Sequence, residues 1–171
     1  MLNIDAEIVS GVGAAGFRLG QDAAELDAAI AESKAWTRAS GRSLMQEVGS
    51  AKGWVCVAHS ELSTKPGAQG KTYYAPGGVV ELHFNGRGQL FNIMLFEGYR
   101  GTVWSDVRVG SPVAAAMAHC DLEYDGGDEA YYPIESSPVK GIGFHANDGS
   151  PDEAIYGITV NDWKLMHERG F

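Results

Sequence analysis

Hydrophobic and polar residues alternate most regularly in the segment Val79–Phe96. In VELHF, near its start, every second residue is apolar, so an extended chain would place the apolar side chains on one face. A glycine-containing break at 85–88 follows, and a second apolar run leads to Phe96. Because this combination is typical of two antiparallel strands joined by a tight turn, we predict a β-hairpin here.

Apolar residues at helical spacing follow Asp22. Leu26 and Ile30 lie four positions apart, on the same side of a helix, and the segment is rich in alanine. Asp22 is a favourable N-cap, and Glu25, three positions later, completes a capping-box pattern. We therefore predict a helix that begins at Asp22 and ends near Gly41.

Between this helix and the hairpin, the sequence predicts one strand and a long loop. Residues 53–59 (GWVCVAH) are mostly apolar, as in a strand. Residues 60–78 contain two prolines and several glycines, which favour a loop. Within that loop, only 71–74 (KTYY) has the character of a short strand.

The same order of features returns in the second half of the chain. Residues 107–110 (VRVG) match 17–20 (FRLG) in residue type at every position. Serine and proline follow at 111–112, a favourable start for a helix. We then predict a short helix at 113–120, a polar loop at 121–140, strands at 142–144 and 155–160, and a last helical turn or tail at 163–171.

These matches indicate two copies of a helix–loop–hairpin unit, at 13–103 and 104–163, the second with a shorter middle. A chain of 171 residues is long enough for one domain with a sizeable core. We expect a single domain, 1–171, of the α+β class. Its predicted architecture is one antiparallel sheet with the helices on one face.

The chain carries a net charge of −9 at pH 7, from 22 acidic and 13 basic residues. Nucleic acids and anionic membranes are bound through clustered lysines and arginines, so this charge argues against both as partners. It favours a basic protein as the partner, because opposite charges speed the encounter.

The sequence also bears on the compartment. The first residues, MLNIDAEIVSG, do not combine a basic segment with an apolar one, and no stretch approaches the roughly 18 apolar residues of a membrane span. The two cysteines, Cys56 and Cys120, are too few for a disulfide scaffold. We therefore expect a cytoplasmic protein.

Four motifs give the two halves a resemblance to a known module: 19–22 (LGQD), 84–90 (FNGRGQL), 109–112 (VGSP) and 144–158. They resemble the repeat of the β-lactamase inhibitor protein family and the single unit of the small lipoproteins of the outer-membrane β-barrel assembly machine. The resemblance implies binding of other proteins through the open face of the sheet and its loops. An export signal, a lipidation cysteine and a cysteine pair within a repeat are missing, so secretion and membrane anchoring are not implied.

In its small size, acidity and expected compartment, the chain also looks like bacterial immunity proteins, which neutralise a toxin. This likeness implies a protein-binding inhibitor, without a cofactor, that occludes the active site of a basic toxin domain. Two alternatives stay open. One is a hydrolase-type enzyme, and the other is a structural subunit that forms a homodimer through its sheet.

Acidic and tyrosine side chains are densest in the segment 121–132 (DLEYDGGDEAYY). Carboxylates favour a cationic protein surface, and tyrosine supplies a large contact area at binding hot spots. A competing contact is the open face of the hairpin around Glu81, His83 and Asn92. The predicted partner-binding residues are Asp121, Glu123, Tyr124, Asp125, Asp128, Glu129, Tyr131 and Tyr132.

The start of this segment imitates a calcium-binding loop, with carboxylates at positions one, three and five and glycine at six. Position twelve is Tyr132, where such a loop needs a bidentate glutamate. We therefore expect no tight calcium binding there.

Catalytic and cofactor motifs are weak. The five histidines form no pair with metal-binding spacing, and we predict no metal site. The segment 11–16 (GVGAAG) fits a dinucleotide fingerprint only superficially, because the predicted helix starts too late. The enzyme alternative requires His59 or His83 to meet Glu81 or Asp106 in a cleft.

Overall fold

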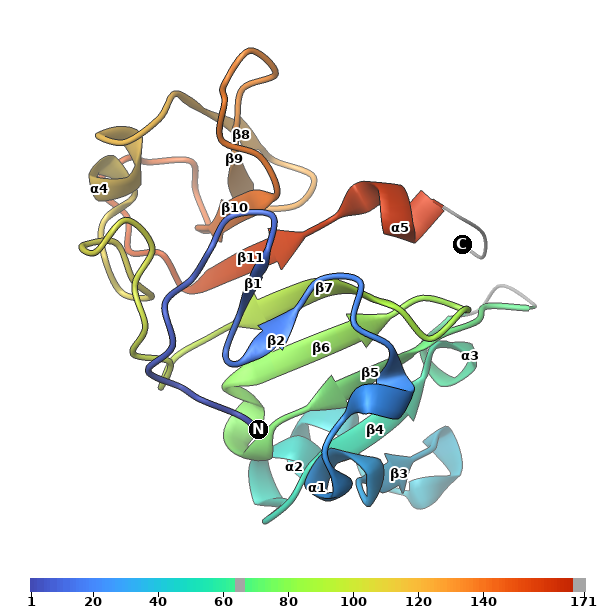
Figure 1. Cartoon of the computed structure of the whole chain (residues 1–171). Coiled ribbons are helices and arrows are strands. Elements are labelled where there is room, and N and C mark those ends of the chain that lie inside the picture. The colour runs from blue at the N-terminus through green and yellow to red at the C-terminus, as the bar shows by residue number, and fades with distance from the viewer. Residues whose placement is uncertain (64–66, 168–171) are drawn as a thin grey trace. The chain divides into compact units, whose positions relative to one another are not determined.

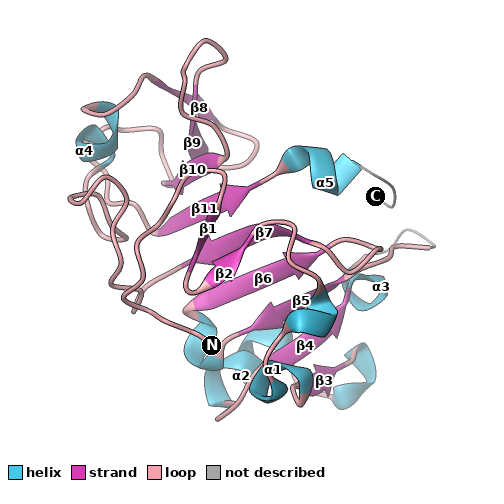
Figure 2. Cartoon of the chain, in the orientation of Figure 1, coloured by secondary structure: helices cyan, strands magenta, loops and turns pink. Residues whose placement is uncertain are grey.

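The computed structural model describes residues 1–63 and 67–167 (Figure 1). The chain is of the α+β class, with more strand than helix (Figure 2). It divides into two compact units. Unit 1 comprises Met1, Leu19–Ile93 and Asp162–Phe171, and unit 2 comprises Leu2–Arg18 and Met94–Asn161.

The sheet of unit 1 has the strand order β3–β4–β5–β6–β7 (Figure 1). Strands β4, β5 and β6 pair antiparallel, whereas β3 runs parallel to β4. The sheet is therefore mixed, and the prediction of a purely antiparallel sheet is wrong. The strands are β3 (Lys34–Trp36), β4 (Val55–Ala58), β5 (Lys71–Tyr74), β6 (Val80–Phe84) and β7 (Leu90–Leu95), which begins in this unit.

The predicted hairpin at 79–96 is confirmed as β6 and β7. Val80, Leu82 and Phe84 are fully buried, while Glu81 and His83, on the other face of β6, are only partly covered. The short connection 85–89 allows only an antiparallel pairing of these neighbouring strands. Burial of alternate residues along β6 thus follows the hydrophobic pattern of the sequence.

The helices of unit 1 are short, and α2 covers part of the sheet. Val48 of α2 is buried against Val55, Val57 and Tyr74, which lie on one face of β4 and β5. The helices are η1 (Ala23–Glu25), α1 (Ala28–Ala31), η2 (Arg38–Ser40), α2 (Leu44–Ser50), α3 (His59–Leu62), η3 (Pro76–Gly78) and α5 (Trp163–His167), where η denotes a 3-10 helix.

The helix predicted from Asp22 to Gly41 is wrong. Asp22 caps only the 3-10 helix η1, and Asp27 caps a separate single turn, α1, by accepting a hydrogen bond from the Ile30 amide (3.2 Å). The chain then extends into β3, where Lys34 pairs with β4 and its ammonium group lies 2.6 Å from the Glu47 carboxylate. Short helices gain little stability alone, so this tertiary pairing overrides the alanine-rich composition.

Unit 2 has the strand order β8–β9–β10–β11, and these strands pair antiparallel. Ile142, Phe144, Ile158 and Val160 fill its core, which confirms the second predicted hairpin. The unit also contains a two-stranded ribbon, β1 with β2. Its elements are β1 (Gly13–Ala14), β2 (Phe17–Arg18), α4 (Val113–Met117), β8 (Leu122–Asp125), β9 (Ala130–Pro133), β10 (Ile142–His145) and β11 (Gly157–Asn161).

Two predictions for this half need correction. The segment 121–140 is not simply a polar loop, because β8 and β9 form a hairpin within it. Its glycine pair at 126–127 supplies the turn, and Tyr124 pairs with Tyr131 across the two strands. Helix α4 ends at Met117 rather than at residue 120.

A capping box fixes the start of α2, a helix that the hydrophobic pattern did not indicate. The Ser43 hydroxyl accepts a hydrogen bond from the Gln46 amide (3.2 Å), and the Gln46 side chain accepts one from the Ser43 amide (3.1 Å). We expect Ser43→Ala to lower the free energy of unfolding by about 1 kcal/mol, measured by urea denaturation. The exposed Ser136 of unit 2 is the control, since Ser136→Ala should change it by less than about 0.5 kcal/mol. Equal effects of the two substitutions would contradict the role of the cap.

Candidate functional site

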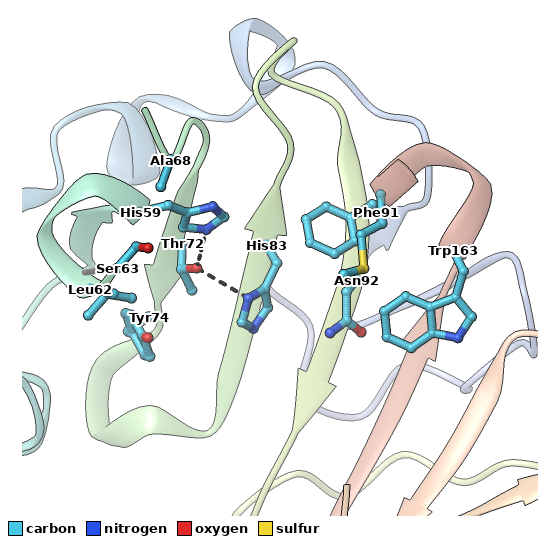
Figure 3. Close-up of a pocket in the computed structure, with 11 residues that line it drawn as sticks. His59, Leu62, Ser63, Ala68, Thr72, Tyr74, His83, Phe91, Asn92 and Trp163 are labelled. Atoms are coloured by element: carbon cyan, nitrogen blue, oxygen red, sulfur yellow. Dashed lines mark hydrogen bonds between the residues drawn. The ribbon is translucent and has the colours of Figure 1, made fainter. Parts of the chain in front are cut away.

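A pocket of about 390 Å³ opens on one face of the unit 1 sheet (Figure 3). Strands β5, β6 and β7 form its floor, and helices α3 and α5 form two of its walls. Its volume lies in the range of small-molecule sites. The lining residues are His59, Leu62, Ser63, Ala68, Thr72, Tyr74, His83, Phe91, Asn92, Trp163 and Met166.

Two histidines, a threonine and a glutamate form a chain of hydrogen bonds beneath this pocket. His59 Nε2 lies 3.1 Å from the Thr72 hydroxyl, which lies 3.2 Å from His83 Nδ1. His83 Nε2 in turn lies 3.2 Å from a carboxylate oxygen of Glu81. Thr72 and His83 are cross-strand partners on β5 and β6, so the pairing register brings them together.

The directions of these bonds follow from the groups at the ends of the chain. The backbone carbonyl of Gln69 only accepts, so His59 Nδ1, 3.0 Å away, carries a proton. Burial lowers the pKa of His59, so its ring is neutral and Nε2 accepts a hydrogen bond from the Thr72 hydroxyl. The Thr72 oxygen in turn accepts a hydrogen bond from the Nδ1–H of His83. His83 Nε2 faces the Glu81 carboxylate, so these two side chains are an ion pair only when the imidazole is protonated.

This geometry meets one condition of the enzyme alternative, because His83 contacts Glu81 beside a cleft. Asp106 lies elsewhere, in unit 2, where its carboxylate is 2.8 Å from His119 Nε2. Both nitrogens of His83 are engaged, by Thr72 and by Glu81, and the Thr72 hydroxyl is the link between two imidazoles. Neither imidazole therefore offers a nitrogen to activate water unless the chain of hydrogen bonds opens.

The predicted partner-binding residues lie together on the β8–β9 hairpin of unit 2 or directly before it. Every carboxylate among them is exposed. Two of the carboxylates also make bonds within the hairpin. Asp125 accepts a hydrogen bond from the Gly127 amide (2.8 Å), and Asp128 accepts one from the Tyr132 hydroxyl (3.2 Å).

The three tyrosines of the hairpin differ in exposure. Tyr131 is 3% exposed, and its ring contacts that of Tyr124 with the centroids 4.9 Å apart. A residue so deeply buried supports the fold of unit 2 and is not available to a partner, so we remove it from the predicted contact. Tyr124 and Tyr132 are half-buried and remain in it.

A groove of about 420 Å³ runs beside this hairpin. Carboxylates of Glu123, Asp125 and Glu135 lie along it, together with the rings of Tyr124 and Tyr132. A groove that combines carboxylates with aromatic rings suits a cationic side chain. Across the described part of the chain, no group of three or more His, Cys, Asp or Glu side chains is placed to hold a metal ion.

The sequence predicted only some of the residues that line the unit 1 pocket. His83 and Asn92 belong to the predicted competing face, but Thr72 and Tyr74 lie in a segment that composition assigns mostly to a loop. The sequence of 71–74 (KTYY) could have indicated them, because a strand there places Thr72 and Tyr74 on the same face. Trp163 and Met166 join the pocket from the end of the chain, and no local pattern relates them to it.

Comparison with protein-family models, with curated proteins and with solved structures finds no match to this chain. In the residues that the structure describes, no helix combines the length and the apolar character needed to cross a lipid bilayer.

Burial of His59 makes the stability of the protein dependent on pH. Its pKa is lowered below 6.5, so between the pKa values of the two states the unfolded chain binds a proton at this position that the folded chain does not. We expect the free energy of unfolding to fall as the pH drops from about 7.5 to 5.5, with a slope of at most about 1.4 kcal/mol per pH unit from this group. Urea denaturation of His59→Gln should show a shallower fall. An identical pH dependence in the variant and the parent would contradict the role of His59.

Proposed function

We propose that this protein is an immunity-type inhibitor that binds a basic protein, a toxin domain, and occludes its active site. The observation that carries the proposal is the β8–β9 hairpin of unit 2, which gathers exposed carboxylates and two half-buried tyrosines beside one groove. The carboxylates steer a cationic partner towards the hairpin, and the tyrosine rings supply buried contact area.

Electrostatic steering is the main role of these carboxylates. Exposed charges add little affinity individually, because water and salt screen them. Several of one sign on a projecting hairpin nevertheless raise the rate at which an oppositely charged partner arrives. The net charge of −9 extends the same field over the molecule.

We also propose that the chain contains two helix–loop–hairpin repeats, at 13–103 and 104–163. In unit 1, the Gly20 amide donates to the Leu90 carbonyl (2.7 Å), and in unit 2 the Gly110 amide donates to the Ile155 carbonyl (2.8 Å). The two glycines are 90 positions apart in the sequence (110 − 20), and their two partners are 65 positions apart (155 − 90). The same offsets relate two further pairs of backbone hydrogen bonds and one pair of bridges. The bond from the Leu90 amide to the Gln21 carbonyl matches that from Ile155 to Ser111, and the bond from the Ala23 amide to the Gly88 carbonyl matches that from Val113 to Glu153. The bridge between Asp22 and Gln89 matches the bridge between Pro112 and Ala154.

A hydrolase-type enzyme remains the second candidate, favoured by the contact between Glu81 and His83, which lines the unit 1 pocket. It requires a substrate that opens the hydrogen-bond chain at Thr72, so that one imidazole gains a free nitrogen. The protein-binding proposal needs no such rearrangement, and we therefore prefer it.

The proposal predicts a specific loss when the hairpin is neutralised. In a triple variant, Glu123→Gln, Asp125→Asn and Glu129→Gln, association with the partner should slow by about tenfold at low salt. Dissociation should change little, because exposed charges act mainly on the encounter. The partner is purified by co-precipitation with the parent protein, and surface plasmon resonance at about 50 and 300 mM NaCl separates the two rates.

A matched control removes three acidic charges from other parts of the protein. Glu25, Glu32 and Glu97 are exposed and lie outside the hairpin, so Glu25→Gln, Glu32→Gln and Glu97→Gln change the net charge equally. The control should retain most of the association rate. If both triple variants slow association to the same extent, the hairpin is not the contact site. If no basic protein binds the parent, the inhibitor proposal fails.

A further inference from the structure

We propose that the pocket of unit 1 binds a small neutral molecule that has an apolar, ring-sized body and one hydrogen-bond acceptor, such as an aromatic ketone. This site is separate from the hairpin of unit 2, and the proposal does not depend on the protein-binding function.

The walls of the pocket favour an apolar, flat ligand. The pocket meets the aliphatic side chain of Leu62 and the aromatic rings of Phe91 and Trp163 (Figure 3). Met166 adds a thioether group to its lining. Leu62 is 45% exposed and Trp163 40% exposed, so apolar surface at the rim remains in contact with water. A ligand that covers these groups gains hydrophobic free energy, and thioether and ring surfaces suit a flat, polarisable body.

The floor of the pocket favours a neutral ligand. His83 already contacts the Glu81 carboxylate and the Thr72 hydroxyl, and His59 shares its hydrogen bonds with Gln69 and Thr72. A charged ligand would lose its hydration without gaining a counter-charge, since the ionisable groups on the floor already satisfy one another.

Tyr74 supplies the hydrogen-bond donor. Its side chain is only 7% exposed, it lines the pocket, and within the described residues its hydroxyl has no hydrogen-bond partner. Burial and the nearby Glu81 carboxylate raise the pKa of Tyr74, so the hydroxyl keeps its proton. In the pocket, a ligand carbonyl would accept a hydrogen bond from this hydroxyl in place of water. Because Glu81 disfavours a second anion nearby, the acceptor is a neutral carbonyl rather than a carboxylate.

Three probes of similar size separate these requirements. Acetophenone has the ring and a neutral acceptor, ethylbenzene has the ring without an acceptor, and benzoate has a charged acceptor. Ligand-observed NMR titration should give acetophenone a Kd of about 1 mM or below, as expected for a fragment of this size. Ethylbenzene and benzoate should each bind about tenfold more weakly, because one lacks the hydrogen bond and the other is charged.

Two tyrosine variants test where the hydrogen bond forms. Tyr74→Phe should weaken acetophenone binding about tenfold and leave the binding of ethylbenzene unchanged. Tyr73→Phe is the matched control, because Tyr73 points to the opposite face, where its ring meets Phe84 with the centroids 5.6 Å apart. It should bind all three probes as the parent protein does. Thermal unfolding verifies that both variants are folded.

The outcomes separate the parts of the proposal. Failure of all three probes to bind the folded parent would overturn the ligand site. Equal binding of acetophenone and ethylbenzene, unaffected by Tyr74→Phe, would overturn the choice of an acceptor-bearing ligand. Benzoate as the tightest binder would overturn its neutrality. A loss of acetophenone affinity in Tyr74→Phe but not in Tyr73→Phe would support the proposal.

Discussion

The buried amide of Asn85 holds together the part of unit 1 on which the pocket depends. The side chain is 2% exposed, so all of its polar atoms need partners inside the protein. Its oxygen accepts hydrogen bonds from the amides of Arg87 and Gln89, both at 3.0 Å, which closes the turn between β6 and β7. Its nitrogen donates to the Leu165 carbonyl at 2.9 Å and so fixes α5 beside the turn. One side chain therefore positions both the hairpin and the helix that supplies a pocket wall.

The register of β6 then separates the core from the pocket. Leu82 and Phe84 enter the core, while Glu81 and His83 face the other side, where Thr72 on β5 meets His83. A shift of one residue would exchange these faces and place the polar side chains of Glu81 and His83 in the core, which is strongly unfavourable. The apolar pattern that stabilises the sheet is thus also what aligns the hydrogen-bond chain beneath the pocket.

Sequence reasoning succeeded where the determining contacts are local. Both hairpins were predicted because alternation and turn residues lie within a few positions of one another. The predicted helix after Asp22 failed because Lys34 finds its partners on β4 and at Glu47, which no local pattern reveals. The pocket could not be predicted for the same reason, since Tyr74 and Trp163 are far apart in the chain and line one pocket only in the folded unit. The acidic hairpin was identified by composition alone, but the burial of Tyr131 was not.

If the two halves are repeats, the corresponding positions have taken different roles. His83 of β6 corresponds to Gly143 of β10, by the offset that relates Leu82 to Ile142. The ring of Tyr132 lies so close to Gly143 that a side chain there would meet it at 2.5 Å. In unit 2 an aromatic ring therefore occupies the surface that unit 1 leaves open as a pocket, and Tyr132 belongs to the acidic hairpin. This difference favours separate functions for the two units, ligand binding in unit 1 and protein binding in unit 2.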